Sequence, residues 1–291
     1  MTSKRREFVK LAPYTTFGIG GAARFLYEPT SEEEVVRALE EIRDLGVPYF
    51  ILGNGSNLLV SDEGYDGAVL HFARNFGRIR REENRIYAES GALLAQVARF
   101  AAREGLSGLE PMSGIPGSVG GAITMNAGAY GGETKDVIER VRVLTKDGVR
   151  EYTNAEMHFS YRHSLITDEG GIVLEATYLL KPDAPEEIFA RIEDFAARRN
   201  AKQPVDMKSA GSTFKRPEGH FAAKLIEDAG LKGFRYRNAG VSAKHAGFIV
   251  NYGDATAEEV LATIKMVQKI VYERFGVKLE PEMKTLGDID V

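Results

Sequence analysis

The sequence predicts an α+β protein with two domains, and three observations lead to this prediction. The chain has 291 residues, more than one typical domain of roughly 100–200 residues and enough for two that each bury a core. Patterns typical of helices alternate with patterns typical of strands. A proline-rich break, KPDAP, occupies residues 181–185. We place the domain boundary in this break, so that residues 1–183 form the first domain and residues 184–291 the second.

The first predicted element is a helix at residues 32–45. Ser31 and Glu34 have the spacing of a capping box, in which the serine side chain accepts the backbone N–H of the third helical residue. Apolar residues then recur at helical spacing until Gly46 ends the pattern. Similar patterns predict a strand at 47–52, short strands in 67–73 and 85–90, and a helix at 92–104.

Residues 108–132 are unusually rich in glycine. They hold too many helix breakers for the interior of a helix and too few charges for a solvated linker. We therefore predict a system of packed loops in this segment. Beyond it, strand patterns occupy 139–145, 148–153, 172–180, 245–251 and 277–281, and helical patterns occupy 186–199, 221–229 and 257–275.

The composition excludes several classes of function. A formal net charge of -4 gives no general attraction for nucleic acid or for an anionic membrane, so we expect neither as a partner. The chain has no cysteine, which removes disulfides, thiol nucleophiles and iron–sulfur clusters. Its histidines follow no metal-binding pattern, so we expect no metal site. We find no secretion signal and no apolar stretch long enough to span a membrane, and we expect a cytoplasmic protein.

Two glycine-rich loops are the strongest sign of a ligand site. They are GNGSN at residues 53–57 and GIPGSVGG at residues 114–121. Glycine lets backbone N–H groups approach a pyrophosphate without an intervening side chain, so these loops predict a dinucleotide phosphate site. Neither loop fits the Rossmann fingerprint, and the chain has no P-loop motif. The alternative is that both loops are tight turns without a ligand.

A series of segments, in order along nearly the whole chain, resembles one known family. The segments are TTFGIGG (15–21), LGNGSNLLV (52–60), EPMSGIPGSVGGAITMNAGAYG (110–131), YRHS (161–164), AGSTFKRP (210–217), GHFAAKLIEDAGLKG (219–233), VSAKHAGFIVN (241–251) and LEPEMKTLG (279–287). They resemble the UDP-N-acetylenolpyruvoylglucosamine reductase family. The short spacing after YRHS matches the family's shorter type, which lacks an insertion that carries an extra substrate-covering tyrosine loop.

The resemblance implies a fold, a cofactor and a reaction. The fold is a two-lobed vanillyl-alcohol-oxidase-type FAD-binding domain followed by a smaller C-terminal α+β substrate-binding domain. The cofactor is non-covalently bound FAD, with NADPH as the reductant. The substrate is UDP-N-acetylglucosamine enolpyruvate, which is reduced to UDP-N-acetylmuramate for the bacterial cell wall. We expect a monomer. The alternatives are an oxidase of alcohols or lactones on the same scaffold and a flavin- or nucleotide-sugar-binding module without turnover.

Residues for the cofactor carry over from the family by motif. The resemblance implies that the first loop holds the pyrophosphate and that the second lies along the dinucleotide and the flavin ring. The implied residues are Gly53, Asn54, Gly55, Ser56 and Asn57 in the first loop, and Ser113, Gly117, Ser118, Gly120, Thr124, Asn126 and Gly128 in and after the second.

Three residues match the family's catalytic groups. Reduction of an enol ether conjugated to a carboxylate needs a hydride, stabilisation of the resulting enolate, and a proton, and the hydride has to come from a cofactor. Arg162 matches the catalytic arginine, Ser212 the proton donor, and Glu282 a glutamate that stabilises the enolate or polarises the arginine. Taken alone, Arg162 is more typical of a surface arginine and Glu282 of a solvated glutamate, while Ser212 is equally typical of a helix or turn cap.

Three basic residues and one glutamine in the second half are candidates for holding the UDP diphosphate. They are Arg199, Lys202, Gln203 and Lys224, and Tyr161 is a further candidate for a substrate contact. The alternative for each charged residue is a solvated position on a helix. The chain departs from many relatives at His163, beside the catalytic arginine, and at Lys284, where an arginine is common; neither departure touches the three catalytic candidates.

Overall fold

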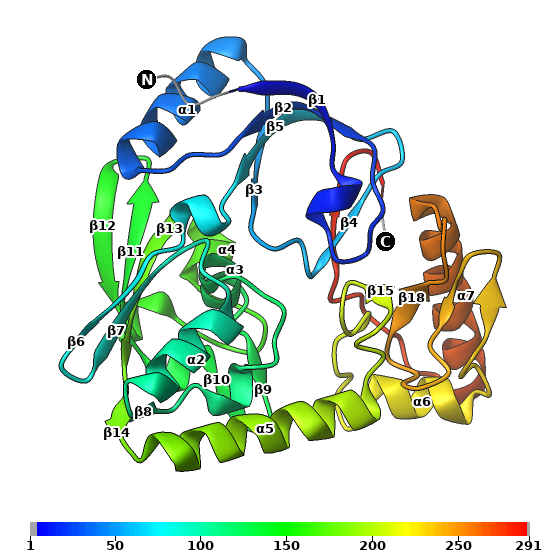
Figure 1. Ribbon diagram of the computed structural model, residues 1–291. Coiled ribbons are helices and arrows are strands. Elements are labelled where there is room, and N and C mark those ends of the chain that lie inside the picture. Colours follow the sequence, from blue (N-terminus) through cyan, green and yellow to red (C-terminus); the bar gives the residue numbers. More distant parts are fainter. Residues whose placement is uncertain (1–4, 290–291) are drawn as a thin grey trace.

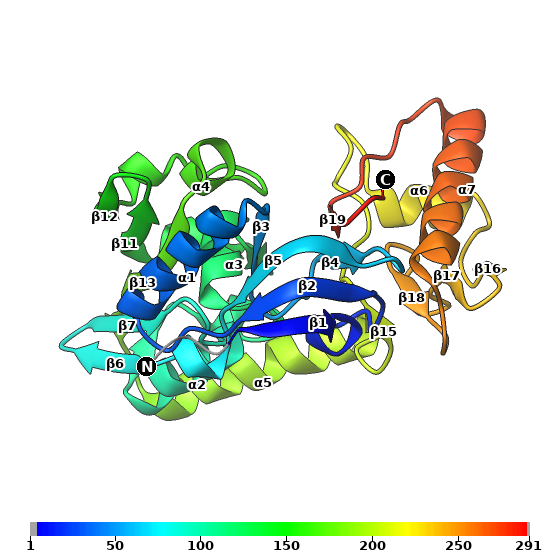
Figure 2. The same ribbon diagram turned by 90° about the horizontal axis from the view of Figure 1, so that it is seen from above.

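The computed structural model describes residues 5–289, and their helices and strands form three regions (Figure 1). We call residues 5–72 lobe 1, residues 73–183 lobe 2 and residues 184–289 the C-terminal region. Lobe 1 and lobe 2 lie beside each other. The helix at residues 185–202 runs along lobe 2, and the rest of the C-terminal region lies on the opposite side of the molecule from lobe 2 in both views (Figures 1 and 2). None of the helices within residues 5–289 is long and apolar enough to cross a membrane.

Lobe 1 contains a four-stranded sheet with one helix. Its elements are β1 (Arg6–Lys10), β2 (Ala22–Tyr27), α1 (Glu32–Leu45), β3 (Tyr49–Leu52), β4 (Leu58–Val60) and β5 (Tyr65–His71). The strand order is β1-β2-β5-β3, with β1 antiparallel and the other neighbours parallel. The side chain of Ser31 accepts the N–H of Glu34, and Gly46 ends α1 with a left-handed φ of 66°. The predicted helix at 32–45 is therefore confirmed.

Lobe 2 contains a five-stranded antiparallel sheet in the order β12-β11-β13-β7-β6. Its elements are β6 (Ile79–Glu82), β7 (Arg85–Glu89), α2 (Leu94–Arg103), β8 (Leu106–Ser107), α3 (Val119–Thr124), β9 (Gly128–Ala129), β10 (Gly132–Glu133), β11 (Ile138–Thr145), β12 (Gly148–Thr153), α4 (Leu165–Glu169), β13 (Ile172–Leu179) and β14 (Lys181–Pro182). Val97 of α2, Val119 of α3 and Val141 of β11 meet in one buried core. This core holds the glycine-rich segment 108–132 against the sheet.

The C-terminal region starts with a long helix that runs from lobe 2 toward the rest of the region (Figure 1). Its elements are α5 (Pro185–Lys202), β15 (Lys208–Ser209), α6 (Ala222–Asp228), β16 (Arg235–Tyr236), β17 (Ala239–Val241), β18 (Ile249–Asn251), α7 (Ala257–Phe275) and β19 (Lys284–Leu286). The sheet β15-β18-β17-β16 packs on α7, which provides Val260, Ile264 and Val267 to the core.

The C-terminal region is attached to lobe 1 by strand pairing, by a helix cap and by a shared core. Strand β19 pairs in parallel with β4 of lobe 1. The carboxylate of Asp62, also in lobe 1, accepts the N–H groups of Ala257 and Glu258 at 3.0 and 3.3 Å and so caps α7. Phe17 and Leu59 of lobe 1 are buried in the same core as α7. The last part of the chain is thus held against the first.

Two sequence predictions about the elements are wrong. The segment 108–132 contains a short helix, α3, although it includes Gly120 and Gly121. A Cβ on Gly120 would lie 2.2 Å from the Ser90 hydroxyl, so close packing requires glycine inside this helix. The predicted strand at 277–281 is absent; only Pro281 forms a bridge, with Phe214.

Residues 277–281 form no strand because their apolar side chains pack in the core around α7 and not on a sheet. Leu279 is buried there, and its carbonyl accepts the Gln268 side-chain amide at 2.9 Å. Pro281 has no N–H for a strand ladder. The predicted strand at 245–251 is shorter for a similar reason, because the Ser242 hydroxyl accepts the N–H groups of Lys244 and His245 and turns the chain before Ile249.

Candidate active site

One large cavity lies where lobe 1, lobe 2 and the C-terminal region meet. Its volume is about 650 Å³. Its lining residues fall into two groups, which we call the neutral wall and the charged wall. The neutral wall is formed by lining residues between Phe50 and Tyr130, none of which carries a charged side chain. The charged wall is formed by later residues and includes Arg162, Arg199, Lys202, His245, Glu282 and Lys284.

The two predicted glycine loops touch each other in the neutral wall. The Asn54 side-chain amide donates to the carbonyl of Pro116 at 2.7 Å. A Cβ on Gly53 would lie 2.2 Å from the Ser118 hydroxyl, so a larger residue there would push the loops apart. Gly55 has a left-handed φ of 60°, and a Cβ on it would lie 2.2 Å from the carbonyl oxygen of Tyr14. Glycine at these positions brings both loops to one surface of main-chain atoms.

Arg162 and Glu282 form an ion pair across the cavity. The Arg162 Nε donates to Glu282 Oε1, and the two side chains are 24% and 13% exposed. Arg162 has a left-handed φ of 56°, which is uncommon for a residue with a side chain and is concentrated at functional sites. The arginine comes from lobe 2 and the glutamate from the segment before β19, so the pair exists only in the folded chain.

Burial raises the pKa of Glu282 above the ordinary value for a glutamate, and the charge of Arg162 opposes only part of that rise. The carboxyl group therefore holds a proton more readily than a solvated glutamate does. In the ionised form it polarises the guanidinium, and in the protonated form it donates a hydrogen bond into the cavity. The protonated form suits a group that stabilises negative charge as it develops, whereas the ionised form leaves that task to the guanidinium that it polarises.

Ser212 is placed next to this pair by its neighbour in sequence. Thr213 is buried, its N–H donates to the carbonyl of Gly247 at 2.9 Å, and its hydroxyl accepts the N–H of Ile249 at 3.0 Å. The Thr213 carbonyl accepts the N–H of Glu282 at 2.8 Å. The backbone of Ser212 is thereby fixed beside that of Glu282, and the Ser212 side chain lines the cavity.

The end of α5 brings polar groups into the cavity without protein partners. Arg199 is half-buried, and burial lowers the pKa of its guanidinium. No carboxylate within residues 5–289 forms an ion pair with it. The Gln203 Oε1 atom is buried and accepts no hydrogen bond from that part of the chain. A buried cation and a buried amide oxygen of this kind are typical of a site that binds a polar, anionic ligand.

Most of the predicted site residues line this cavity. They are Gly53, Asn54, Gly55, Ser56, Asn57, Gly117, Ser118, Gly120, Thr124, Gly128, Arg162, Arg199, Lys202, Gln203, Ser212 and Glu282.

Four predicted residues do not line it. Ser113 donates to the Glu110 carbonyl. The buried Asn126 side chain donates to the Glu133 carboxylate and the Ser160 carbonyl and accepts the N–H of Lys135. Tyr161 lines a neighbouring cavity of about 520 Å³ that also includes Arg162. Lys224 pairs with Asp228, four residues later on α6.

Three further lining residues were not among the predicted contacts. Tyr130 has a left-handed φ of 52° and packs on Phe195 of α5 with ring centroids 5.0 Å apart. The Nδ1 atom of His245 accepts the N–H of Gly247 at 3.1 Å, and burial lowers the pKa of its ring. Lys284 lies on β19. The sequence signals were a tyrosine within the glycine-rich segment, a histidine in a motif that carried the family resemblance, and a lysine where that family commonly has arginine.

Comparisons with known proteins identify the family. A family model described as UDP-N-acetylenolpyruvoylglucosamine reductase, C-terminal domain, matches residues 203–286, and one described as FAD binding domain matches residues 23–153. The UDP-N-acetylenolpyruvoylglucosamine reductase of Caldicellulosiruptor saccharolyticus is 48% identical over 290 residues, covering 98% of this chain and 93% of the relative. The chain belongs to the UDP-N-acetylenolpyruvoylglucosamine reductase family.

Other members of the family agree. The reductase of Geobacillus kaustophilus is 48% identical over 276 residues, covering 94% of this chain and 90% of the relative. A crystal structure of UDP-N-acetylenolpyruvylglucosamine reductase from Thermus caldophilus is 40% identical, with a TM-score of 0.85, and covers 99% of this chain and 100% of that chain. The resemblance and the fold class predicted from the sequence, a two-lobed FAD-binding domain with a smaller C-terminal α+β domain, are confirmed.

The cavity fits the FAD that the family implies. Its volume of about 650 Å³ lies within the ~300–1,000 Å³ range of ligand pockets. The neutral wall presents glycine main chain, as backbone recognition of a pyrophosphate requires: a Cβ on Gly53 would lie against Ser118, which lines the cavity, and one on Gly55 would displace the loop from the Tyr14 backbone behind it. Asn54, Ser56, Asn57 and Ser118 add neutral polar groups along that wall.

Proposed function

We propose that this chain reduces UDP-N-acetylglucosamine enolpyruvate to UDP-N-acetylmuramate with NADPH, in the synthesis of peptidoglycan precursors. One observation carries the proposal: Arg162, Ser212 and Glu282, distant in sequence, line one cavity together with both glycine loops. The protein acts in the cytoplasm as a monomer, with residues 1–183 for FAD and 184–291 for the substrate. When bound, FAD supplies the hydride, which it takes from NADPH.

Ser212 gives a proton to C2 of the enolpyruvyl group. An unassisted serine hydroxyl is a weak acid, so this role needs a polarising neighbour. The hydrogen bond between the Thr213 carbonyl and the Glu282 N–H holds Ser212 beside the Arg162–Glu282 pair. The positive guanidinium in a half-buried site lowers the cost of leaving negative charge on the serine oxygen.

Arg162 and Glu282 stabilise the enolate that exists before this proton arrives. The guanidinium fork can hold the substrate carboxylate through two N–H groups as charge builds on it. Its left-handed backbone and its bond to Glu282 fix its direction before the substrate binds, so little reorganisation is needed during the reaction.

Arg199, Lys202 and Gln203 at the end of α5 bind the anionic part of the substrate. The half-buried guanidinium of Arg199 has no carboxylate partner within residues 5–289, and the diphosphate of a UDP sugar provides the missing anion. NADPH carries a diphosphate as well, so the two substrates use this cleft in turn.

Visible absorption of the purified protein tests the proposal. We expect flavin bands that NADPH bleaches without oxygen and that the UDP sugar restores, with UDP-N-acetylmuramate as the product. Fast recovery by oxygen alone, with no effect of the UDP sugar, would instead identify an oxidase. Flavin bands that NADPH leaves unchanged would contradict the proposal and point to a binding module.

A further inference from the structure

One face of α5 follows the glycine-rich segment of lobe 2. Arg191, Phe195 and Arg199 are spaced four residues apart and so lie on the same face of the helix. Arg191 bonds to Glu110, Phe195 packs on Tyr130, and the Cδ atom of Arg199 lies 3.0 Å from where a Cβ on Gly114 would be. The helix that carries the substrate-binding groups is thus aligned along the segment that lines the cofactor side.

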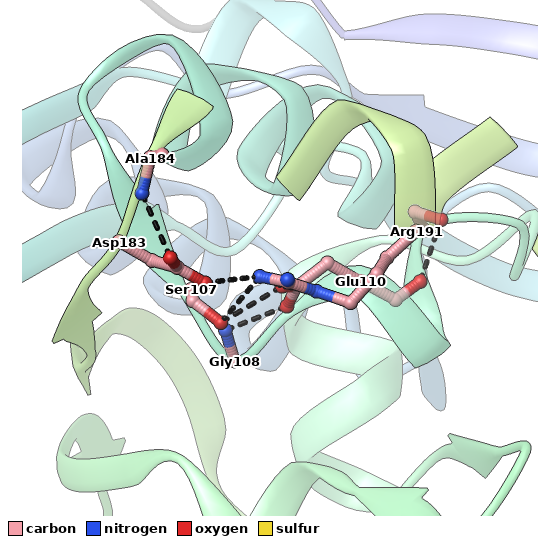
Figure 3. A network of polar contacts seen from close by, with 7 residues as sticks. Ser107, Gly108, Glu110, Asp183, Ala184 and Arg191 are labelled. Atoms are coloured by element: carbon pink, nitrogen blue, oxygen red, sulfur yellow. Dashed lines mark hydrogen bonds and ion pairs between the residues drawn. The ribbon is translucent and has the colours of Figure 1, made fainter. Parts of the chain in front are cut away.

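Arg191 fixes the position of the helix along this segment, and Figure 3 shows the network around it. Its Nε and Nη2 atoms donate to one oxygen of Glu110 at 3.0 and 2.9 Å. Nη2 also donates to Asp183, whose other carboxylate oxygen accepts the N–H of Ala184 at the start of α5. One guanidinium therefore joins lobe 2, the proposed domain boundary and the helix.

Glu110 is a rigid partner for this arginine. Its side chain is 4% exposed, and it also accepts the Ser107 hydroxyl at 2.8 Å and the Gly108 N–H at 2.6 Å. Burial would raise the pKa of Glu110, but the hydrogen bonds from its own backbone, Gly108, Ser107 and Arg191 together lower it. The group therefore stays ionised at neutral pH and keeps its attraction for Arg191.

We propose that Arg191 is a positioning residue for substrate binding: by pairing with Glu110 it sets where Arg199 meets the anionic end of the UDP sugar. Arg191 does not line the cavity, so it acts through the helix. The two residues are eight positions apart, about 12 Å at ~1.5 Å per residue. A helix transmits a shift at one position to the other, and the planar fork on Glu110 resists sliding better than a single ammonium would.

The inference rests on the proposed function, and Arg191→Lys tests it. The lysine keeps the charge but loses the fork. We expect the KM for the UDP sugar to rise about tenfold, equivalent to ~1.4 kcal/mol, while kcat per bound flavin changes less than about twofold. Arg198→Lys is the matched control, because Arg198 is on the same helix and its ion pair, with Asp194 four residues earlier, stays within that helix; its guanidinium also lies 5.8 Å from the Phe195 ring centroid, and lysine keeps the charge there.

A second pair of variants shows whether the effect passes through Arg199. In an Arg199→Met background, Arg191→Lys should raise the KM by less than about twofold, because the group that it positions is gone. If the two substitutions multiply as independent effects, Arg191 does not act through Arg199 and the proposal is wrong. An unchanged KM in Arg191→Lys with normal flavin content also overturns it.

Two measurements keep a folding defect separate from a positioning defect. Flavin content and melting temperature report folding, and the rates are given per mole of bound flavin. Glu110→Gln removes the charge from the other side and should raise the KM in the same direction, measured with UDP-N-acetylglucosamine enolpyruvate and, for binding alone, with UDP by calorimetry. Failure of the proposed function would appear in the unsubstituted protein as no turnover of the UDP sugar, which is a different result.

Discussion

The neutral wall and the charged wall offer different kinds of contact to an anionic ligand. The neutral wall, between Phe50 and Tyr130, relies on main chain and uncharged side chains, whereas the charged wall gathers four Lys or Arg side chains and Glu282. Among substitutions only proline removes a main-chain N–H group, but any larger residue can replace glycine, so the neutral wall is sensitive to added atoms. The charged wall is sensitive to the loss of atoms, because its contacts are made by the charged ends of side chains.

The largest expected effect comes from the charged wall. Ser212→Ala removes the proposed proton donor and should slow reduction of the UDP sugar by ~10²–10⁴-fold, the usual contribution of a general acid. Reduction of the flavin by NADPH needs no proton at C2 and should be nearly unchanged. Stopped-flow absorbance measures the two half-reactions separately. Equal slowing of both would show that Ser212 is not the proton donor.

On the neutral wall, an added methyl group should release the cofactor. Gly55→Ala forces a side chain onto a left-handed residue, which costs roughly 1–2 kcal/mol, and its Cβ would lie 2.2 Å from the Tyr14 carbonyl oxygen. We expect a lower melting temperature and loss of FAD on gel filtration. Gly46→Ala is the control: Gly46 also has a left-handed φ, of 66°, but a Cβ on it would meet nothing within 4 Å and the residue does not line the cavity, so FAD should be retained. Retention of FAD by Gly55→Ala at wild-type affinity would contradict this account of the wall.

A matched pair of lysines tests the extent of the charged wall. Lys202 lines the cavity, whereas Lys224 pairs with Asp228 outside it. Lys202→Met should therefore raise the KM for the UDP sugar by about tenfold, on the scale of one charge-assisted hydrogen bond. Lys224→Met should change it less than about twofold. Steady-state kinetics measure both KM values. A larger rise for Lys224→Met than for Lys202→Met would indicate that Lys224, and not Lys202, binds the diphosphate.

The smallest expected effect is a pH dependence that separates two buried glutamates. The pKa of Glu282 is raised by burial, so its contribution to stability is present at acidic pH and is lost as the pH rises from the ordinary glutamate value through the raised one. The pKa of Glu110 is lowered, so its contribution is present above the ordinary value and is lost as the pH falls. For each of Glu282→Gln and Glu110→Gln, the difference between its urea midpoint and that of the parent is measured from pH 4 to 8 at fixed salt. As the pH rises, this difference should change in opposite directions for the two variants. Changes of the same sign would show that one of these directions is wrong.

The sequence predicted those parts of the fold whose local signals agree with their packing. Helix 32–45 has a cap, a periodic face and a terminal glycine, and all three are used in α1. Helix 257–275 matches α7 because its N-cap Thr256 and its final Gly276 are equally local signals. Local signals failed where a tertiary contact determines which residue is tolerated. Gly120 lies inside α3, and glycine is required there because Ser90 leaves no room for a side chain.

For the site, the sequence supplied the residue types but not their partners. The glycine loops were predicted as a phosphate site from chemistry alone, while the catalytic roles of Arg162, Ser212 and Glu282 came from family resemblance. No local pattern contains the ion pair between Arg162 and Glu282, since it joins a turn of lobe 2 to a segment before β19. The contact between Arg191 and Glu110 was likewise invisible, because both residues look like ordinary charges on the surface.

The pairing of β19 with β4 has a consequence for biosynthesis. Ribosomes make a chain from its N-terminus, and domains generally fold as units in that order. Both glycine loops are therefore complete long before Glu282 emerges, and Glu282 reaches the cavity only when the strand two residues after it docks beside Leu58–Val60. The nascent chain can acquire its cofactor surface early, yet it stays without its carboxylate until the segment after α7 has been made and has docked on β4.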